Sequence, residues 1–384
     1  MRKLNLGAAG LGRAFALMAP TLAADTRVAV VAGADPRPEA RRKFSRDFSA
    51  PAYPTVDELC ADPRVDVVYV ATPHQLHAEN ACLATSRGKH VLVEKPMALA
   101  LEECRAMVRA ARGAGVHLVV GHSHSFDAPI SHTRSLIQTG AFGRIRMISA
   151  LNYTDFLYRP RRAEELDAAK GGGAVMNQAA HHVDVVRFLS GGVVKSVRAM
   201  TGAWDSARPV EGAYSALLAL ADGAFATLAY SGYGHFDSDE LLGWIGEGGQ
   251  RKDPARHGGA RLALTENETE LKNARNYGGE QFASPSPPVA HPHFGFLVVS
   301  CEHADLRPTP QGVWICDDRE RRLENIPPPA VPRAGVIDEL YAAVVEGRRP
   351  LHDGAWGLAT VEVCLAMLRS AREGKEIALP GPTA

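Results

Sequence analysis

The stretch from Asp66 to Leu99 constrains the fold of this chain more than any other part of the sequence. Its first part, residues 67–71, is short, apolar and rich in β-branched side chains; a helical pattern and a second apolar run, residues 90–93, follow. This order predicts a βαβ unit. Ligands of such sheets bind beyond the carboxyl ends of the strands, which is where the sequence has Thr72, Pro73, Glu94, Lys95 and Pro96.

Lys95 is the residue of this stretch that we expect to carry chemistry. Most lysines are solvated surface residues, but Lys95 stands between a buried strand and Pro96, which favours an extended backbone before it. Residues 97–112 have the pattern of an amphipathic helix, whose N-terminus we expect near the ammonium. The positive end of a helix lowers the pKa of a lysine and suits it to proton transfer near neutral pH.

Length and composition narrow the class of protein. A chain of 384 residues predicts two domains. Its 43 basic and 43 acidic residues balance, and no basic run is present, which favours a small-molecule partner over nucleic acid. Apolar runs are too short for a membrane span of about 18 residues. The six cysteines lack CxxC spacing and predict reduced thiols of a cytoplasmic protein.

The N-terminus predicts a dinucleotide site. Residues 4–9 read as a first strand rather than a secretion signal, because glycines and Arg13 interrupt the apolar run. Gly10, Leu11 and Gly12 form the tight turn of a degenerate GxGxxG fingerprint, with Phe15 at the third glycine. Asp35 closes the next strand, where an acid holds the adenosine ribose and repels a 2′-phosphate. We therefore expect NAD, although Arg37 and Arg41 leave NADP open.

A second domain is expected from residue 123, so that the predicted domains are 1–122 and 123–384. The runs at 146–156, 194–204, 213–234 and 242–249 read as strands, with a hairpin turn at 221–224. Residues 248–332 predict an irregular insertion, and 333–346 and 354–373 predict helices. The fold class is α/β, a Rossmann domain followed by an α+β domain with an open, largely antiparallel sheet.

A glycine run opens a further candidate site. In KGGGAVMNQAAHHVD, three glycines precede a helix on which Asn177, His181 and Asp184 share one face by the i, i+4, i+7 rule. A helix histidine is more often packed or solvated than catalytic, but the glycine run and this spacing favour a role in catalysis. His181 is therefore a candidate base.

With these motifs in order, the chain resembles the Gfo/Idh/MocA oxidoreductases, through its ATPxxxH (Ala71 to His77) and EKP (Glu94 to Pro96) elements. The resemblance implies that Lys95 touches substrate and nicotinamide, that the bond before Pro96 is cis, and that His181 removes a hydroxyl proton. Asn177 stands where the family has an aspartate. The cofactor-binding residues expected are Gly10, Leu11, Gly12, Arg13, Asp35, Arg37, Thr72, Pro73, His77, Glu94, Lys95 and Pro96.

A loop after the first strand of the second domain, the arginine loop (residues 152–162), indicates the class of substrate. Arg159 and Arg161 flank Pro160, and arginine forks bind carboxylates bidentately. The runs NYTDFLYRPRR, EGAYSALL and YSGYGHFDSDE are similar to a subfamily of dihydrodiol dehydrogenases acting on phthalate-type dicarboxylates. That resemblance implies oxidation of a cis-diol to a catechol, driven by aromatisation. The substrate-binding residues expected are Asn177, Tyr153, Arg159, Arg161, Phe126 and His235.

Three alternatives stay open at this point. His235, His291 and His293 invite a metal reading, but no zinc spacing supports it, and we expect no metal. An aspartate at position 177 would have favoured a sugar or inositol dehydrogenase. A non-catalytic dinucleotide sensor would have no chemical need for Lys95 and His181. The family resemblance also implies a homodimer or homotetramer.

Overall fold

The computed structural model describes residues 2–256, 259–264, 267–284, 288–328, 331 and 333–381, which form two compact units. The first unit contains residues 2–122 together with 267–284, 331 and 333–361; the second contains the other described residues. The expected boundary after residue 122 is therefore the place where the chain first passes from the first unit to the second. Two later segments of the predicted second domain belong to the first unit, because each packs against its sheet or helices.

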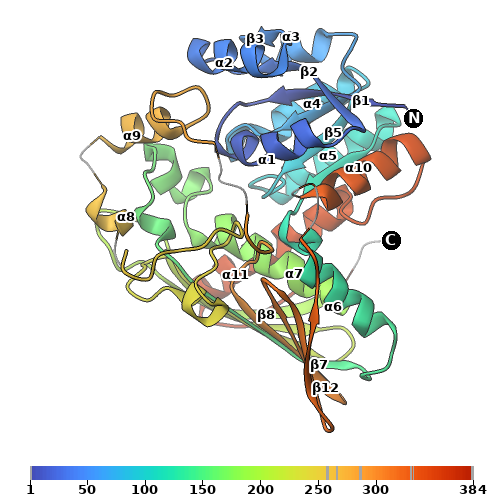
Figure 1. The fold of residues 1–384 in the computed structure, drawn as a ribbon, viewed down its shortest axis with the longest axis vertical. Helices are drawn as coiled ribbons and strands as arrows, with labels where there is room; N and C mark the ends of the chain where they lie inside the picture. The colour runs from blue at the N-terminus through green and yellow to red at the C-terminus, as the bar shows by residue number, and fades with distance from the viewer. Residues whose placement is uncertain are drawn as a thin grey trace. The chain divides into compact units, whose positions relative to one another are not determined.

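Among the described residues, the first unit has one parallel sheet of six strands in the order β3-β2-β1-β4-β5-β6 (Figure 1). Its apolar strands are buried on both faces, as parallel strands between helices must be. The strands are β1 (Leu4–Ala9), β2 (Val28–Ala34), β3 (Ala52–Tyr53), β4 (Val67–Val70), β5 (His90–Glu94) and β6 (Leu118–Gly121). The helices are α1 (Arg13–Ala24), α2 (Pro38–Phe48), α3 (Val56–Ala61), α4 (His77–Ser86), α5 (Leu101–Ala114), α9 (Glu268–Arg275) and α10 (Ala334–Glu346).

The second unit has, in its described residues, a sheet of nine strands in the order β14-β13-β12-β11-β7-β10-β9-β8-β15. Among the strand pairs of the described residues, β7 with β10 is the parallel one and the others are antiparallel, so the expected largely antiparallel sheet is confirmed. Its strands are β7 (Ile145–Tyr153), β8 (Val194–Gly202), β9 (Ala213–Leu220), β10 (Phe225–Ser231), β11 (Phe296–Cys301), β12 (Ala304–Thr309), β13 (Gly312–Asp317), β14 (Arg321–Asn325) and β15 (Ile377–Ala378). Its helices are α6 (Ala128–Gln138), α7 (Ala180–Ser190), α8 (Gly259–Leu262) and most of α11 (Gly354–Glu373).

Helices α6 and α7 lie along one face of this sheet (Figure 1). The strands accordingly alternate: in β9, Ala216 and Leu218 are buried, whereas Ser215 and Leu217 are exposed. The helix side therefore holds the core, and the opposite side of β8 to β10 faces outward.

Three sequence predictions of secondary structure need correction or restriction. Residues 242–249 do not form a strand, because Gly243, Trp244 and Gly249 have positive φ angles; only an isolated bridge at Ile245 remains. The helix expected from residue 97 begins at Leu101, where the Glu103 carboxylate accepts the backbone N–H of Ala100 and caps it. The insertion expected at 248–332 contains β11 to β14, and parts of it lie outside the described residues.

All six cysteines are free thiols, as expected. In the part of the chain that the structure describes, no helix combines the length and the apolar character needed to cross a membrane.

Candidate active site

The glycine turn after β1 leaves an open cradle in the first unit. Gly10 has φ 89°, and a Cβ there would stand 2.7 Å from the carbonyl oxygen of Ala71, so only glycine fits. A Cβ at Gly12 would meet nothing within 4 Å. Open space therefore lies at the N-terminus of α1, where backbone N–H groups and the helix dipole favour a pyrophosphate. Leu11 is buried, while Arg13 is exposed as the first residue of α1.

Asp35 follows β2, and neighbouring donors hold its carboxylate in place. Its carboxylate accepts the backbone N–H of Leu11 at 2.9 Å and the Nε of Arg37 at 3.0 Å. Arg37 also donates to the carbonyl of Leu11 at 2.8 Å. The Arg37 guanidinium is thus paired with the Asp35 carboxylate. Its positive charge is offset by that carboxylate, so this place does not favour a 2′-phosphate.

The ends of β4 and β5 are tied together by His77. Its ring nitrogens lie 2.9 Å from the carbonyl oxygens of Pro96 and Thr72, and the side chain is fully buried. Burial lowers the pKa of His77, and a neutral ring donates only one of these two hydrogen bonds. The Lys95–Pro96 bond is cis, as the family resemblance implied.

The structure changes the argument for Lys95 in one respect. Because α5 begins at Leu101, no helix N-terminus follows Pro96 directly, and the expected lowering of the lysine pKa by a helix dipole loses its basis. Glu94, expected to bind cofactor, accepts a hydrogen bond from the hydroxyl of Tyr69 at 2.6 Å. Lys95 keeps its place at the carboxyl end of β5, beside Glu94.

In the second unit, Asn177 lies in a π-helical turn, Val175–Ala179, which precedes α7. This turn interrupts the regular spacing that placed Asn177 and His181 on one helix face. The Asn177 amide donates to the carbonyl oxygens of Gly171 at 2.9 Å and Gly173 at 2.7 Å. An aspartate in the same place could not donate either bond, so the residue stabilises the glycine run in a way the family carboxylate would not.

His181 lies on α7 among aromatic rings. Its ring centroid is 4.6 Å from that of Phe294 and 4.7 Å from that of His124, the latter nearly edge to face. His182 packs on Phe294 too, and its Nδ1 is 2.8 Å from the Tyr214 hydroxyl. Burial and the neighbouring His124 lower the pKa of His182 to about 3, which keeps it neutral.

Sequence reasoning missed His124, which contacts His181, and the two carboxylates near His124. His124 is buried, with Nδ1 2.8 Å from the carboxylate of Asp127 and Nε2 3.5 Å from that of Glu247. Burial disfavours the charged ring, but the two carboxylates outweigh it and raise the pKa of His124 to about 9. The HxxD spacing of His124 and Asp127 in HSHSFD is the sequence signal that could have found this pair.

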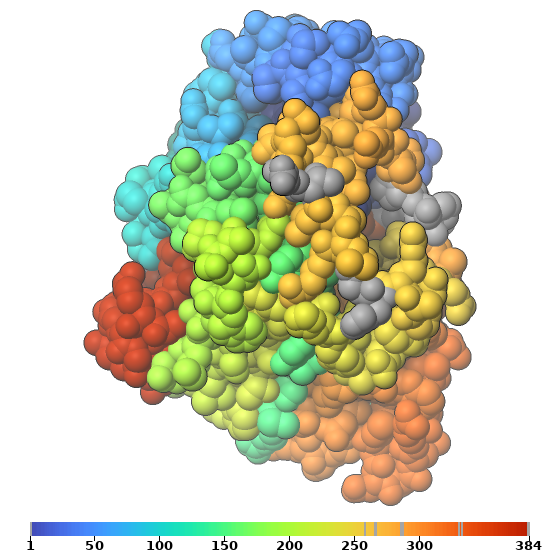
Figure 2. Space-filling model, turned by 90° about the vertical axis from the view of Figure 1, so that its left-hand side faces the viewer, coloured from blue at the N-terminus to red at the C-terminus, as the bar shows by residue number. Residues whose placement is uncertain are grey.

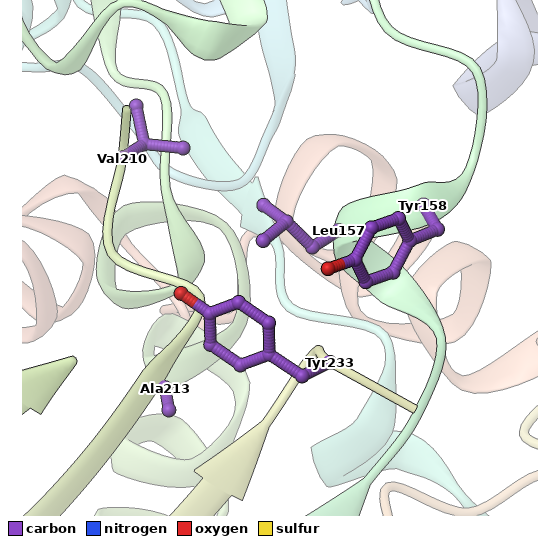
Figure 3. Packing of buried hydrophobic residues seen from close by; sticks show 5 residues of the cluster. All are labelled: Leu157, Tyr158, Val210, Ala213 and Tyr233. Carbon is purple, nitrogen blue, oxygen red and sulfur yellow. The ribbon is translucent and has the colours of Figure 1, made fainter. Parts of the chain in front are cut away.

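The arginine loop is fixed by a buried cluster, formed by Leu157, Tyr158, Val210, Ala213 and Tyr233 (Figure 3). Gly212 is required in it, because a Cβ would stand 2.6 Å from the Tyr233 ring. The two arginines differ. Arg159 is half-exposed and its Nε donates to Asp155 at 3.1 Å, whereas the Arg161 guanidinium lies 3.9 Å from the centre of the Phe156 ring and bonds to the Phe156 carbonyl.

The other expected substrate-binding residues lie in the same unit. Tyr153 ends β7 and packs edge to face against Phe236, whereas His235 is exposed. Phe126 is partly buried in the turn that also carries His124. A cavity of about 20 Å³ next to His124 has room for one water molecule and not for a substrate ring.

Comparison with known proteins decides the family. Residues 4–122 match the oxidoreductase family with an NAD-binding Rossmann fold, and 130–252 match the GFO/IDH/MocA C-terminal domain. The chain is 47% identical over 377 residues to 1-carboxy-3-chloro-3,4-dihydroxycyclohexa-1,5-diene dehydrogenase of Comamonas testosteroni, covering 96% of this chain and 95% of the relative. This chain belongs to the Gfo/Idh/MocA family. It is an NAD-dependent oxidoreductase, as the sequence motifs predicted.

Solved structures of two dehydrogenases share the fold of this chain. A dehydrogenase from Bordetella bronchiseptica RB50 has a TM-score of 0.93 at 42% identity, over 98% of this chain and all of the other. The WlbA dehydrogenase of Bordetella pertussis, solved with NADH and UDP-GlcNAcA, has a TM-score of 0.69 at 25% identity, over 99% of both chains. The cradle at Gly12 and the carboxylate of Asp35 fit the NAD that this family binds.

Proposed function

We propose that this chain oxidises a cyclic cis-diol that carries a ring carboxylate, with NAD⁺ as the hydride acceptor. The name of the Comamonas testosteroni relative describes a dihydroxycyclohexadiene with one carboxyl group. The arginine loop and the aromatic rings around His181 suit a flat anionic substrate. Both a monocarboxylate and the phthalate-type dicarboxylate indicated by the sequence belong to this class.

The observation that carries the proposal is the use of the Asn177 amide. Because it donates to Gly171 and Gly173, position 177 supplies His181 with no carboxylate to stabilise an imidazolium. A cyclohexadiene diol needs little help, since the ketone formed by loss of hydride tautomerises to an aromatic catechol.

Two residues of the chain act on the reacting hydroxyl in this scheme. The family resemblance assigns removal of the hydroxyl proton to His181 and polarisation of the hydroxyl oxygen to Lys95, and NAD⁺ is the acceptor of the hydride from the same carbon. The products are the ring ketone, NADH and one proton, and the ketone then becomes the catechol by moving a proton. NADH formation therefore equals diol consumed.

NADH absorbance on a substrate panel tests the function. The panel contains mono- and dicarboxylated cyclohexadiene cis-diols, an uncarboxylated cyclohexadiene cis-diol, glucose and myo-inositol. We expect kcat/KM for at least one carboxylated diol to exceed that for either sugar-like compound by about 100-fold or more. Preference for glucose or inositol would return the chain to the sugar dehydrogenases, and silence on the whole panel with intact NADH binding would favour a sensor.

Lys95→Ala tests the assigned chemistry. Removal of the ammonium should lower kcat on the preferred diol by about 100- to 10,000-fold. NADH should still bind to the variant, which is measured by the rise of NADH fluorescence on binding. Lys195→Ala, at an exposed position of β8, is the matched control. Activity of Lys95→Ala within threefold of the parent would exclude Lys95 from the reaction.

We also infer that the enzyme works in the cytoplasm as a homodimer or homotetramer. Six free thiols fit a reducing compartment. The outward face of the nine-stranded sheet supports self-association, because it exposes the apolar side chains of Met200, Leu217 and Phe225.

A further inference from the structure

One carboxylate in the second unit is shared between two cations. The Glu247 carboxylate is 3.5 Å from Nε2 of His124 and 3.9 Å from the guanidinium of Arg159. Charge-assisted hydrogen bonds are about 2.7–2.9 Å long. Glu247 therefore attracts both cations without a close bond to either in these two contacts.

Each cation is held from its other side by a closer carboxylate. Asp127 lies 2.8 Å from Nδ1 of His124, and Asp155 lies 3.1 Å from Nε of Arg159. Both pairs are local, three and four residues apart, so they orient the cations within their own turns. His124 Nε2 and a terminal nitrogen of Arg159 are thereby directed towards one place, which the Glu247 carboxylate now occupies.

The walls near this place suit a flat ring. The rings of His181 and Phe294 both contact His124, at 4.7 and 5.1 Å between centroids. The raised pKa of His124 keeps its ring positively charged at neutral pH. An anionic group on a planar substrate would meet positive charge here and aromatic surface beside it.

The Glu247 side chain reaches solvent beside this place. It is about one third exposed and is flanked by Gly246, Gly248 and Gly249. Its backbone stays fixed, because its carbonyl accepts the N–H of His293 at 3.1 Å. Arg161 is not a second clamp of the same kind, since it is packed on Phe156 within its own loop.

We propose that His124 and Arg159 form the binding subsite for the ring carboxylate of the substrate, and that Glu247 occupies this subsite when no substrate is bound. The inference rests on the proposed function for the kind of substrate. Binding is an exchange of one carboxylate for another, so Glu247 competes with the substrate. His124 and Arg159 then determine specificity for carboxylated over neutral diols.

Glu247→Gln and Arg159→Gln test the exchange in opposite directions. With a monocarboxylated cyclohexadiene cis-diol, we expect Glu247→Gln to lower KM about threefold or more and Arg159→Gln to raise it about tenfold or more. On the uncarboxylated diol the change of KM in each variant should be at least threefold smaller than its change on the carboxylated diol. Glu240→Gln, an exposed glutamate of the same unit, is the matched control.

Benzoate binding to the NADH complex, measured by calorimetry, separates this inference from the proposed function. Tighter binding to Glu247→Gln and weaker binding to Arg159→Gln would support the subsite even if no diol were oxidised, in which case only the proposed reaction fails. Equal changes of KM on carboxylated and neutral diols, or benzoate affinities unchanged in both variants, would overturn the subsite while leaving the dehydrogenase activity in place.

Discussion

The Asn177 amide donates two hydrogen bonds to carbonyl groups of the glycine run that leads into α7. A carboxylate at this position would face the same two carbonyl oxygens and would repel them. The family aspartate therefore cannot be restored here without cost to the fold. Sequence comparison alone marks position 177 as a lost catalytic group, whereas the contacts show what the amide does instead.

Asn177→Asp should lower the free energy of unfolding by about 1 to 3 kcal/mol, since two buried or partly buried carbonyl groups lose their donors. Urea unfolding at pH 7 measures the loss. Asn325→Asp, at the exposed end of β14, controls for the added charge. A variant as stable as the parent would show that the glycine run is held by other contacts.

His182 gives the fold a dependence on pH. Its pKa is lowered to about 3 in the folded chain, from about 6.5 when unfolded. The unfolded chain therefore binds a proton that the folded chain does not, and this stabilisation is present above pH 6.5 and is lost as pH falls towards 3. Between pH 6 and 5 the slope should approach about 1.4 kcal/mol per pH unit from this residue alone.

Urea unfolding of the parent and of His182→Gln at pH 7, 6 and 5 measures that slope. Glutamine keeps a polar partner for the Tyr214 hydroxyl and does not titrate. The variant should lose less stability than the parent over this range. The same slope in both proteins would place the titration elsewhere.

At the scale of elements, the segment 267–284 belongs to the first unit, although the residues before and after it in the chain belong to the second. The Tyr277 hydroxyl donates to Asp47 at 2.6 Å, and its ring packs edge to face on Phe15 at 5.1 Å. Lys43 lies over the rings of Tyr277 and Phe282. Figure 2 shows this orange segment at the surface beside the blue N-terminal residues. It covers the helix α2 that follows Asp35 and Arg37.

Gly278→Ala should loosen this segment. Gly278 has φ 82°, and a Cβ there would stand 2.6 Å from the Cα of Ala40. Because Arg37 donates to the Tyr277 carbonyl at 3.4 Å, we expect a lower Tm and an NADH affinity weakened several-fold. Gly259→Ala, where a Cβ meets nothing within 4 Å, is the control. Unchanged NADH affinity in Gly278→Ala would separate the segment from the cofactor site.

The same segment shows why sequence reasoning reached some elements and not others. Strands such as β4 and β5 are short, apolar and bounded by turn residues, so their pattern is local and could be predicted. The place of residues 267–284 depends on contacts with residues more than 200 positions earlier, which no local pattern encodes. Likewise Lys95 and His181 follow from motifs, but Glu247 near His124 follows only from tertiary packing.

At the scale of the whole molecule, the outward face of the second sheet carries large apolar side chains. Met200, Leu217 and Phe225 are 69%, 47% and 42% exposed and lie on the same side of β8, β9 and β10, as the strand register requires. Apolar groups collected on one sheet face mark an interaction surface. We expect this face to pair with a second copy of the chain.

Leu217→Asp should shift the protein towards monomers, because an uncompensated charge in an apolar interface is costly to bury. Light scattering after gel filtration gives the mass of the parent and of the variant. Leu262→Asp, at an exposed position of α8, adds the same charge elsewhere. A parent that is already monomeric at micromolar concentration would refute the expectation.

The first unit gathers residues 2–122 with 333–361: the backbone N–H of Val120, in β6, donates to the carbonyl of His352 at 2.8 Å. During synthesis, β1 to β6 leave the ribosome about 200 residues before the segment that completes their unit. Nascent chains therefore carry an unfinished edge of the first unit's sheet from the end of β6 until residues 333–361 have been made.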